Sequence, residues 1–128
     1  MDRPWLRYYE DGVPTVINFP QISLNHIFAD AVKQVPGAEV ISFLGTRITY
    51  FELDKYVKQI SKALIRLGVK KGDSVALMLP NIPQYVIFHF AVLNVGGIVV
   101  PTNPLYGERE LEYQINDSGA EIIITLDM

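Results

Sequence analysis

Residues 69–80 read VKKGDSVALMLP, a polar turn followed by an almost unbroken apolar run. The pair Gly72-Asp73 is typical of a turn, and the run from Val75 to Leu79 contains no polar residue. Such a run is typical of a strand in a parallel sheet that is covered on both faces. We therefore predict a turn and then a fully buried strand in this stretch.

The sequence that follows repeats the change from strand to helix. Pro83 suits the first turn of a helix, where its missing N–H would be unpaired anyway. We predict, in order, a helix over Pro83–Val95, a strand over Ile98–Val100, a helix over Glu108–Asp117 ended near Gly119, and a strand over Glu121–Leu126. Short connections between alternating strands and helices imply right-handed parallel crossovers. The predicted fold class is α/β, with a three-stranded parallel βαβαβ sheet and flanking helices.

A helix with a strong start signal precedes this unit. Thr49 and Glu52 match the capping box, in which each residue satisfies a free N–H group near the other. Gly68 stands where a C-terminal glycine is expected. One apolar stripe is predicted to be buried, and its members are Leu53, Tyr56, Val57, Ile60, Leu64 and Leu67.

Three further elements are predicted upstream. Ser23 is a candidate N-cap for a helix whose apolar positions run from Leu24 to Val35, and Pro36-Gly37 closes it. Two short strands, Glu39–Phe43 and Thr46–Thr49, should form a β-hairpin around Gly45. Residues 1–22 are rich in proline and aromatic residues and show no helical or strand period, so an extended arm is expected.

Composition limits the classes of function. The chain has 128 residues, 49% hydrophobic content and a net charge of −3, which suits one compact domain. Its 11 basic residues form no stripe, so no nucleic-acid partner is expected. It has no cysteine, no signal peptide and no apolar run of transmembrane length, so a cytoplasmic location is the default.

Motifs that could form an active site are absent or incomplete. The KKGDS stretch lacks the glycine spacing of a phosphate loop, so Lys70–Asp73 is interpreted as a helix-to-strand turn. Gly96-Gly97 is interpreted as a close helix-to-strand contact, because the three-glycine dinucleotide fingerprint is missing. His26 and His89 are interpreted as core or boundary residues of helices, without a metal-ligand partner at the required spacing.

The remaining polar candidates are also interpreted structurally. The acidic cluster Glu108, Glu110 and Glu112, with Arg109, suits a solvated helix start, where the helix dipole favours carboxylates. None of the serines at positions 23, 42, 61, 74 and 118 lies in a nucleophile elbow or beside a predicted base. From these patterns we predict no catalytic, no cofactor-binding and no metal-binding residue.

Four blocks of the sequence resemble a known family. They are PWLRYYEDGVPTVIN at the start, ITYFEL, GVKKGDSVALMLPNIPQY, and GGIVVPTNPLYGERELEYQINDSGAEIII. In this order they resemble the N-terminal part of adenylate-forming, AMP-binding acyl-CoA synthetases, and more closely the bacterial long-chain fatty-acid-CoA ligases. The stretch from Asn103 to Ala120 is the most specific piece.

The resemblance implies a two-step reaction with ATP, CoA and magnesium. A fatty acid and ATP give an acyl-adenylate and pyrophosphate, and the CoA thiol then forms the thioester. In the family, the parts that bind nucleotide and catalyse lie later in the chain. The blocks matched by Thr49–Leu53 and Asn94–Pro104 are interpreted as scaffold, so no catalytic residue is transferred to this sequence.

The resemblance also sets expectations for organisation and partners. We expect an arm at 1–22, a partial α/β subdomain at 23–128, and a truncated chain that is inactive alone. Apolar surface and an open sheet edge at the last strand should cause self-association. Fatty acid is the partner implied for the parent enzyme, and peripheral contact with the inner membrane is left open. The alternative is a stand-alone interaction or acyl-binding module without catalysis.

Overall fold

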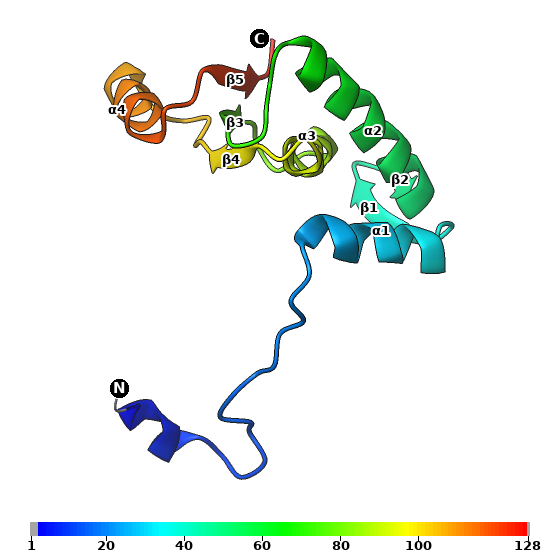
Figure 1. The fold of residues 1–128 in the computed structure, drawn as a ribbon, viewed down its shortest axis with the longest axis vertical. Coiled ribbons are helices and arrows are strands. Elements are labelled where there is room, and N and C mark those ends of the chain that lie inside the picture. Colours follow the sequence, from blue (N-terminus) through cyan, green and yellow to red (C-terminus); the bar gives the residue numbers. More distant parts are fainter. Residues whose placement is uncertain (1–2, 128) are drawn as a thin grey trace.

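The computed structural model describes residues 3–127, and its centre is a three-stranded parallel sheet (Figure 1). The strand order is β4 (Ile98–Pro101), β3 (Ser74–Met78) and β5 (Ile122–Thr125). Both outer strands run parallel to β3, and Val75 pairs with Val99 on one side and with Ile122 on the other. The α/β class and the parallel βαβαβ arrangement predicted from the sequence are confirmed.

The central strand is buried from its second residue to its fourth. Val75, Ala76 and Leu77 have no exposed surface. Helix α4 (Glu108–Ser118) lies on one side of the sheet, and α2 (Tyr50–Arg66) and α3 (Pro83–Asn94) lie on the other (Figure 1). The apolar run therefore packs in the middle of the molecule, as its composition predicted.

Helices α2 and α3 form the main helix pair of the core. The buried side chains Leu53, Val57 and Leu64 of α2 belong to the same apolar cluster as Ala91 and Val92 of α3. Because α3 is apolar around most of its circumference, it can contact helices α1 and α2 and the sheet together.

The predicted apolar stripe of α2 is wrong at two positions. Tyr56 and Leu67 are exposed, although both were expected to be buried. Leu67 is the C-cap residue and lies beyond the last turn of α2, where Gly68 adopts a positive φ of 94°. Tyr56 faces a shallow surface hollow beside the hairpin and the start of α3.

The first helix and the hairpin pack at the other end of the core. Helix α1 (Leu24–Gln34) begins at Ser23, whose hydroxyl accepts a hydrogen bond from the His26 N–H group. Strands β1 (Glu39–Phe43) and β2 (Thr46–Thr49) pair antiparallel. Both elements form as the sequence predicted.

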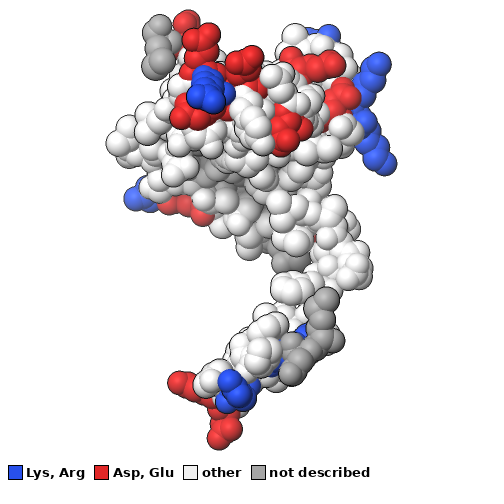
Figure 2. Space-filling model, turned by 90° about the vertical axis from the view of Figure 1, so that its left-hand side faces the viewer, with Lys and Arg blue, Asp and Glu red and all other residues white. Residues whose placement is uncertain are grey.

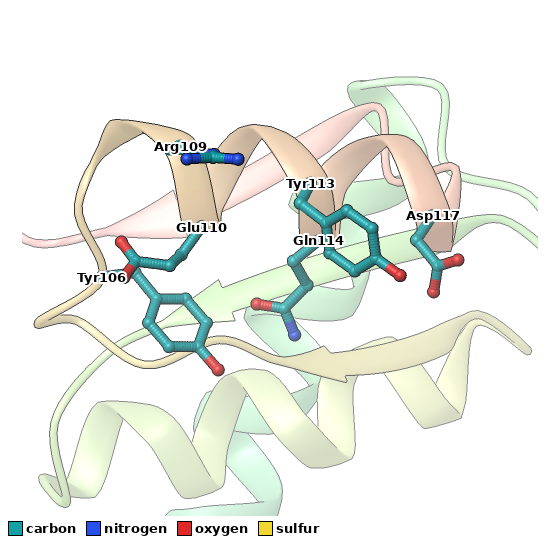
Figure 3. A pocket seen from close by; sticks show the side chains of 6 residues that line it. All are labelled: Tyr106, Arg109, Glu110, Tyr113, Gln114 and Asp117. Carbon is teal, nitrogen blue, oxygen red and sulfur yellow. The ribbon is translucent and has the colours of Figure 1, made fainter.

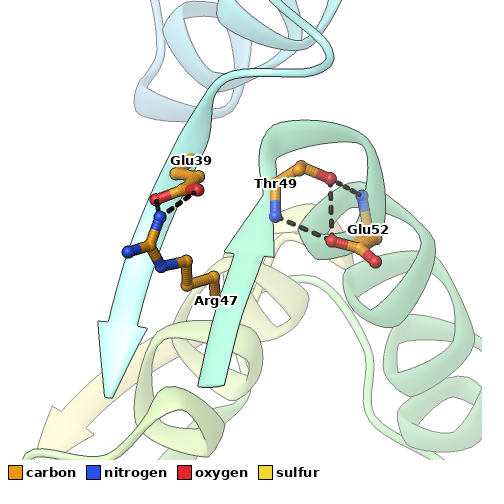
Figure 4. Close-up of polar contacts among 4 residues, drawn as sticks. All are labelled: Glu39, Arg47, Thr49 and Glu52. Carbon is orange, nitrogen blue, oxygen red and sulfur yellow. Dashed lines mark hydrogen bonds and ion pairs between the residues drawn. The ribbon is translucent and has the colours of Figure 1, made fainter. Parts of the chain in front are cut away.

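Two polar pairs fix the hairpin and the start of α2 (Figure 4). Arg47 donates to both carboxylate oxygens of Glu39 at 2.8 and 3.2 Å, which links β2 to β1. The Thr49 N–H group donates to Glu52 Oε2 at 2.8 Å, and the Glu52 N–H group donates to Thr49 Oγ1 at 3.3 Å. Hydrogen bonds from the Thr49 backbone and hydroxyl lower the pKa of the Glu52 carboxyl. The predicted capping box is confirmed.

Residues 3–22 form an arm that leaves the start of α1 and runs away from the body (Figure 1). The arm is not extended throughout, because Pro4–Tyr8 form a short 3-10 helix, η1. The sequence prediction is wrong for these five residues. Pro4 stands at the first helical position, where its fixed φ already suits a helical turn.

Helix α3 and strand β4 meet at a glycine pair, as predicted. A β-carbon at Gly97 would lie 3.0 Å from Val92 Cγ1 and 3.2 Å from the Asp73 carbonyl oxygen. Gly96 has a positive φ of 79°, which favours glycine. The Gly96 carbonyl accepts from the Gly72 N–H group at 2.9 Å, so the turn before β3 is tied to the turn before β4.

Candidate functional site: the carboxyl end of β4 and helix α4

The carboxyl ends of parallel strands are the usual ligand-binding edge of an open α/β sheet. At this edge β4 is followed by Thr102, which is buried. Its N–H group donates to the Leu77 carbonyl at 3.1 Å, and its hydroxyl donates to the Val100 carbonyl at 3.2 Å. These two bonds extend the contact between β4 and β3 beyond the last strand residue.

The loop after β4 is held by local hydrogen bonds. Asn103 Oδ1 accepts from the Leu105 N–H group at 3.0 Å, and the Asn103 carbonyl accepts from the Tyr106 N–H group at 3.1 Å. Glu110 Oε2 accepts from the Gly107 N–H group at 2.8 Å, which caps the start of α4. These hydrogen bonds hold the loop in one conformation, and this conformation sets where α4 begins relative to β4.

Gln114 connects α4 to the end of β4. Its Nε2 donates to the Pro101 carbonyl at 2.9 Å, while its Oε1 is buried and has no hydrogen-bond partner among the described residues. In Figure 3 the Gln114 amide points from the helix toward this strand. This hydrogen bond holds the face of α4 that carries Gln114 against the end of β4.

This face of α4 lines a surface pocket of about 700 Å³ (Figure 3). All of its residues come from α4 and from the loop just before it, at helical spacing. They are Tyr106, Arg109, Glu110, Tyr113, Gln114 and Asp117. The two tyrosine rings give the pocket apolar surface, and the other side chains give it hydrogen-bonding groups.

The charges of the pocket do not suit a nucleotide. Arg109 is the one basic residue in the lining, against the two carboxylates of Glu110 and Asp117. Phosphate groups require several positively charged or N–H donors, and an acidic lining repels them. Among residues 3–127 no group of three or more His, Cys, Asp or Glu side chains could hold a metal ion. The lining of this pocket therefore does not fit ATP, and no reaction step is assigned to it.

Two polar stretches had been interpreted from the sequence as parts of the scaffold, one as a turn and one as a helix start. Both have the predicted structure. Lys70–Asp73 form a turn in which Asp73 Oδ2 accepts from the Lys70 N–H group at 2.7 Å. Glu108, Glu110 and Glu112 are exposed on the first turns of α4. Neither stretch brings an acid and a base together.

The histidine prediction is wrong for His26, which does not lie in the core or at its boundary. His26 is exposed, and its Nε2 lies 3.3 Å from Asp30 Oδ2 one helical turn later, so the sequence interpretation missed this carboxylate partner. His89 lies partly buried on α3 between the rings of Tyr85 and Phe90, and its Nδ1 has no hydrogen-bond partner among the residues described. The two histidines belong to different helices and form no shared site.

The pocket was not predicted from the sequence. Tyr106, Glu110, Gln114 and Asp117 are spaced by four, four and three residues, which places them on one helix face. That spacing was a usable signal, but the same residues are also typical of a solvated helix surface. Only the bond from Gln114 to Pro101 distinguishes this face from the others.

The family model described as "AMP-binding enzyme" matches residues 28–128. The chain belongs to this family of AMP-binding enzymes. The matched range contains the sheet, the pocket on α4 and the glycine pair, and it excludes the arm. The resemblance to this family is thus confirmed for the three sequence blocks that lie within residues 28–128.

Relatives of this AMP-binding chain are similar along nearly its whole length. It is 43% identical over 126 residues to a long-chain-fatty-acid–CoA ligase of Bacillus subtilis, which covers 98% of this chain and 22% of that protein. It is 41% identical to a long-chain-fatty-acid–CoA ligase of Escherichia coli, with 97% and 22% covered. The chain therefore spans about a fifth of the length of these relatives.

A solved structure confirms the fold of the AMP-binding chain. The N-terminal subdomain of NpsA from Klebsiella oxytoca, in complex with 3-hydroxyanthranilyl-AMSN, superposes with a TM-score of 0.79 and 28% identity. The match covers 82% of this chain and 27% of that chain. Within residues 3–127, no helix of the AMP-binding chain has both the length and the apolar character needed to span a bilayer.

Proposed function

We propose that this chain is the N-terminal scaffold of a long-chain fatty-acid–CoA ligase. The observation that carries the proposal is the 43% identity to a long-chain-fatty-acid–CoA ligase over 98% of the chain. In the whole enzyme, ATP and a fatty acid give an acyl-adenylate and pyrophosphate, and CoA then takes the acyl group as a thioester. ATP, CoA and magnesium are the cofactors of that reaction.

The residues of this chain support the reaction indirectly. They form a parallel sheet whose central strand is buried, and we propose that its carboxyl edge, including the loop after β4, faces the rest of the enzyme. No described side chain pair has the geometry of a nucleophile with its base. We propose that the chain alone is inactive, with residues 1–22 as an arm and residues 23–128 as a partial α/β subdomain.

A chimera tests the proposal. The matching segment of the Bacillus subtilis ligase is replaced by this chain, and release of pyrophosphate and formation of thioester are measured with palmitate, ATP and CoA. We expect the chimera to retain measurable activity, because the two segments are 43% identical over nearly the whole chain. The control chimera carries the matching segment of gramicidin S synthase 2 from Brevibacillus brevis, which is 31% identical to this chain.

Two measurements distinguish a ligase scaffold from a stand-alone acyl-binding module. A chimera that unfolds cooperatively at the temperature of the parent ligase, yet forms no palmitoyl-CoA, contradicts the proposal. Calorimetry with palmitate and with ATP on the 128-residue chain tests the stand-alone acyl-binding module. Saturable binding of palmitate by this chain supports the module instead of the scaffold.

A further inference from the structure

The net negative charge of the chain is concentrated on α4. The whole chain has 11 basic and 14 acidic residues. Helix α4 holds one of the basic residues, Arg109, and four of the acidic ones, so the rest of the chain has ten of each and is neutral. The four are Glu108, Glu110, Glu112 and Asp117. Figure 2 views the side on which α4 lies and shows acidic side chains gathered at the top of the body. A basic partner therefore complements this helix.

Helix α4 is also the least covered α-helix among the described residues. Helices α1, α2 and α3 each bury at least one residue, and α4 buries none. Of the two tyrosines that line its pocket, Tyr113 is 73% exposed and Tyr106 is 39% exposed. Tyrosine is one of the residue types that contribute most to binding at protein interfaces. This face is thus open to a partner.

Asp117 lies where a carboxylate destabilises a helix. It is the last residue but one of α4, and the partial negative charge of the helix C-terminus repels it. The last turn of α4 holds no basic residue. Within residues 3–127, no Lys, Arg or His side chain forms an ion pair with Asp117. A cation from outside would neutralise the carboxylate and the helix end together.

Gln114 brings an unpaired acceptor to the same pocket. Its Nε2 donates to the Pro101 carbonyl, while its buried Oε1 has no hydrogen-bond partner in the described part of the chain. In Figure 3 the amide lies between the rings of Tyr106 and Tyr113. A buried acceptor without a donor destabilises the folded state. The pocket therefore favours an occupant that carries N–H donors.

Three of these groups lie close enough together to contact one cation. Asp117 follows Tyr113 by four residues and Gln114 by three, and side chains at these spacings have β-carbons about 5–6 Å apart. A guanidinium group is planar and has five N–H donors, so it can stack on a tyrosine ring while it donates to a carboxylate and to an amide oxygen. An ammonium group is a compact, strongly hydrated charge and suits this combination less well.

Arg109 does not fill this position itself. It precedes Gln114 by five residues, which places the two side chains about 140° apart around the helix. In Figure 3 its guanidinium group points away from the Gln114 amide. Its charge weakens the attraction for a cation but does not cancel that of the two lining carboxylates.

We propose that the α4 pocket binds an arginine side chain of a basic polypeptide partner. The guanidinium group stacks on Tyr113 and donates to Asp117 and to Gln114. The carboxylates at the start of α4 attract further basic residues of the same segment. Binding requires neither ATP nor a fatty acid, so an inactive ligase chimera would leave this proposal unaffected.

Titration of the full 128-residue chain with short peptides tests the site. The probe is the hexapeptide Gly-Arg-Gly-Gly-Arg-Gly with both ends blocked. In one control peptide citrulline replaces arginine, which keeps the shape without the charge, and in the other lysine keeps the charge. Amide chemical shifts are measured by NMR. We expect saturable shifts centred on residues 106–118 with the arginine peptide, weaker binding of the lysine peptide and no binding of the citrulline peptide.

Two substitutions that remove the same charge from the same helix provide the matched comparison. Asp117→Asn removes a carboxylate of the pocket, and Glu112→Gln removes one outside its lining. Both positions are exposed, so both variants should fold. We expect Asp117→Asn to weaken binding of the arginine peptide about fivefold, and Glu112→Gln to weaken it clearly less. An absence of shifts at residues 106–118, equal losses in the two variants, or equal affinity for the arginine peptide and either control peptide would each overturn the proposal.

Discussion

Asn94 on α3 donates its side-chain N–H to the hydroxyl of Ser61 on α2 at 3.0 Å. The Ser61 hydroxyl in turn donates to the Val57 carbonyl at 2.8 Å, within the buried contact of the two helices. The pair therefore joins the two largest helices by a polar bond inside an apolar interface. Sequence analysis treated Ser61 only as a candidate nucleophile and rejected it.

Removal of this bond should destabilise the chain modestly. For Ser61→Ala we expect the free energy of unfolding to fall by about 1 kcal/mol, partly offset by the better helix propensity of alanine. Urea denaturation measures the change. In a double-mutant cycle with Asn94→Ala, a coupling energy near zero would show that the hydrogen bond does not stabilise the helix pair.

The capping box should control both the stability and the acid sensitivity of α2. Thr49→Ala removes the hydroxyl that accepts from the Glu52 N–H group, and we expect a loss of about 1 kcal/mol of unfolding free energy. Thermal unfolding at neutral pH measures it. The same substitution at Thr46, which precedes the cap by three residues and is exposed, serves as the control.

The pH dependence has a defined sign. The hydrogen bonds of Thr49 lower the pKa of Glu52 from 4.5, so the folded state binds this proton less readily than the unfolded state. Its stabilising contribution is present above pH 4.5 and is lost as the pH falls through the lowered pKa. Glu52→Gln should flatten the acid limb of the stability curve. An unchanged slope below pH 4.5 in this variant would argue against the assignment.

The glycine pair gives a matched comparison of two alanine substitutions. Gly97→Ala places a methyl group 3.0 Å from Val92 Cγ1 and against two carbonyl oxygens, and we expect a loss of roughly 1–3 kcal/mol from overpacking. Gly37→Ala has no atom within 4 Å and should be neutral or stabilising by up to about 1 kcal/mol. Equal effects of the two substitutions, measured by urea denaturation, would contradict the close contact.

The tip of the hairpin should accept a stabilising change. Leu44 has a positive φ of 46°, which strains the backbone of a residue with a β-carbon, and its side chain is 90% exposed and offers little packing to offset that strain. Leu44→Asn should raise the unfolding free energy by about 1 kcal/mol, because asparagine tolerates this conformation and Asn-Gly suits the turn with Gly45. Thermal unfolding checks this, with Leu105→Asn as the control. A lower midpoint for Leu44→Asn would show that the leucine makes a contact.

Most of the fold could be predicted because its signals are local. The apolar run after Ser74 indicated a strand buried on both faces, and Thr49 with Glu52 marked the start of α2 to the residue. Gly96-Gly97 indicated a close approach of two elements. Each of these signals depends on residues within a few positions of one another.

The parts that were missed depend on neighbours distant in sequence. Tyr56 fits the apolar period of α2, but its exposure depends on where the hairpin and the start of α3 lie. The pocket on α4 required knowledge that Gln114 reaches Pro101 across a strand end.

The order of the strands has a consequence for biosynthesis. Residue 74 pairs with residue 98 across one helix, and residue 75 pairs with residue 122 across two helices and strand β4, so both parallel pairings form within residues 74–125. A nascent chain can therefore form these three strands as soon as residues 74–125 have left the ribosome. Both outer strands then offer free backbone groups, so the sheet can serve as a template on which later strands are added.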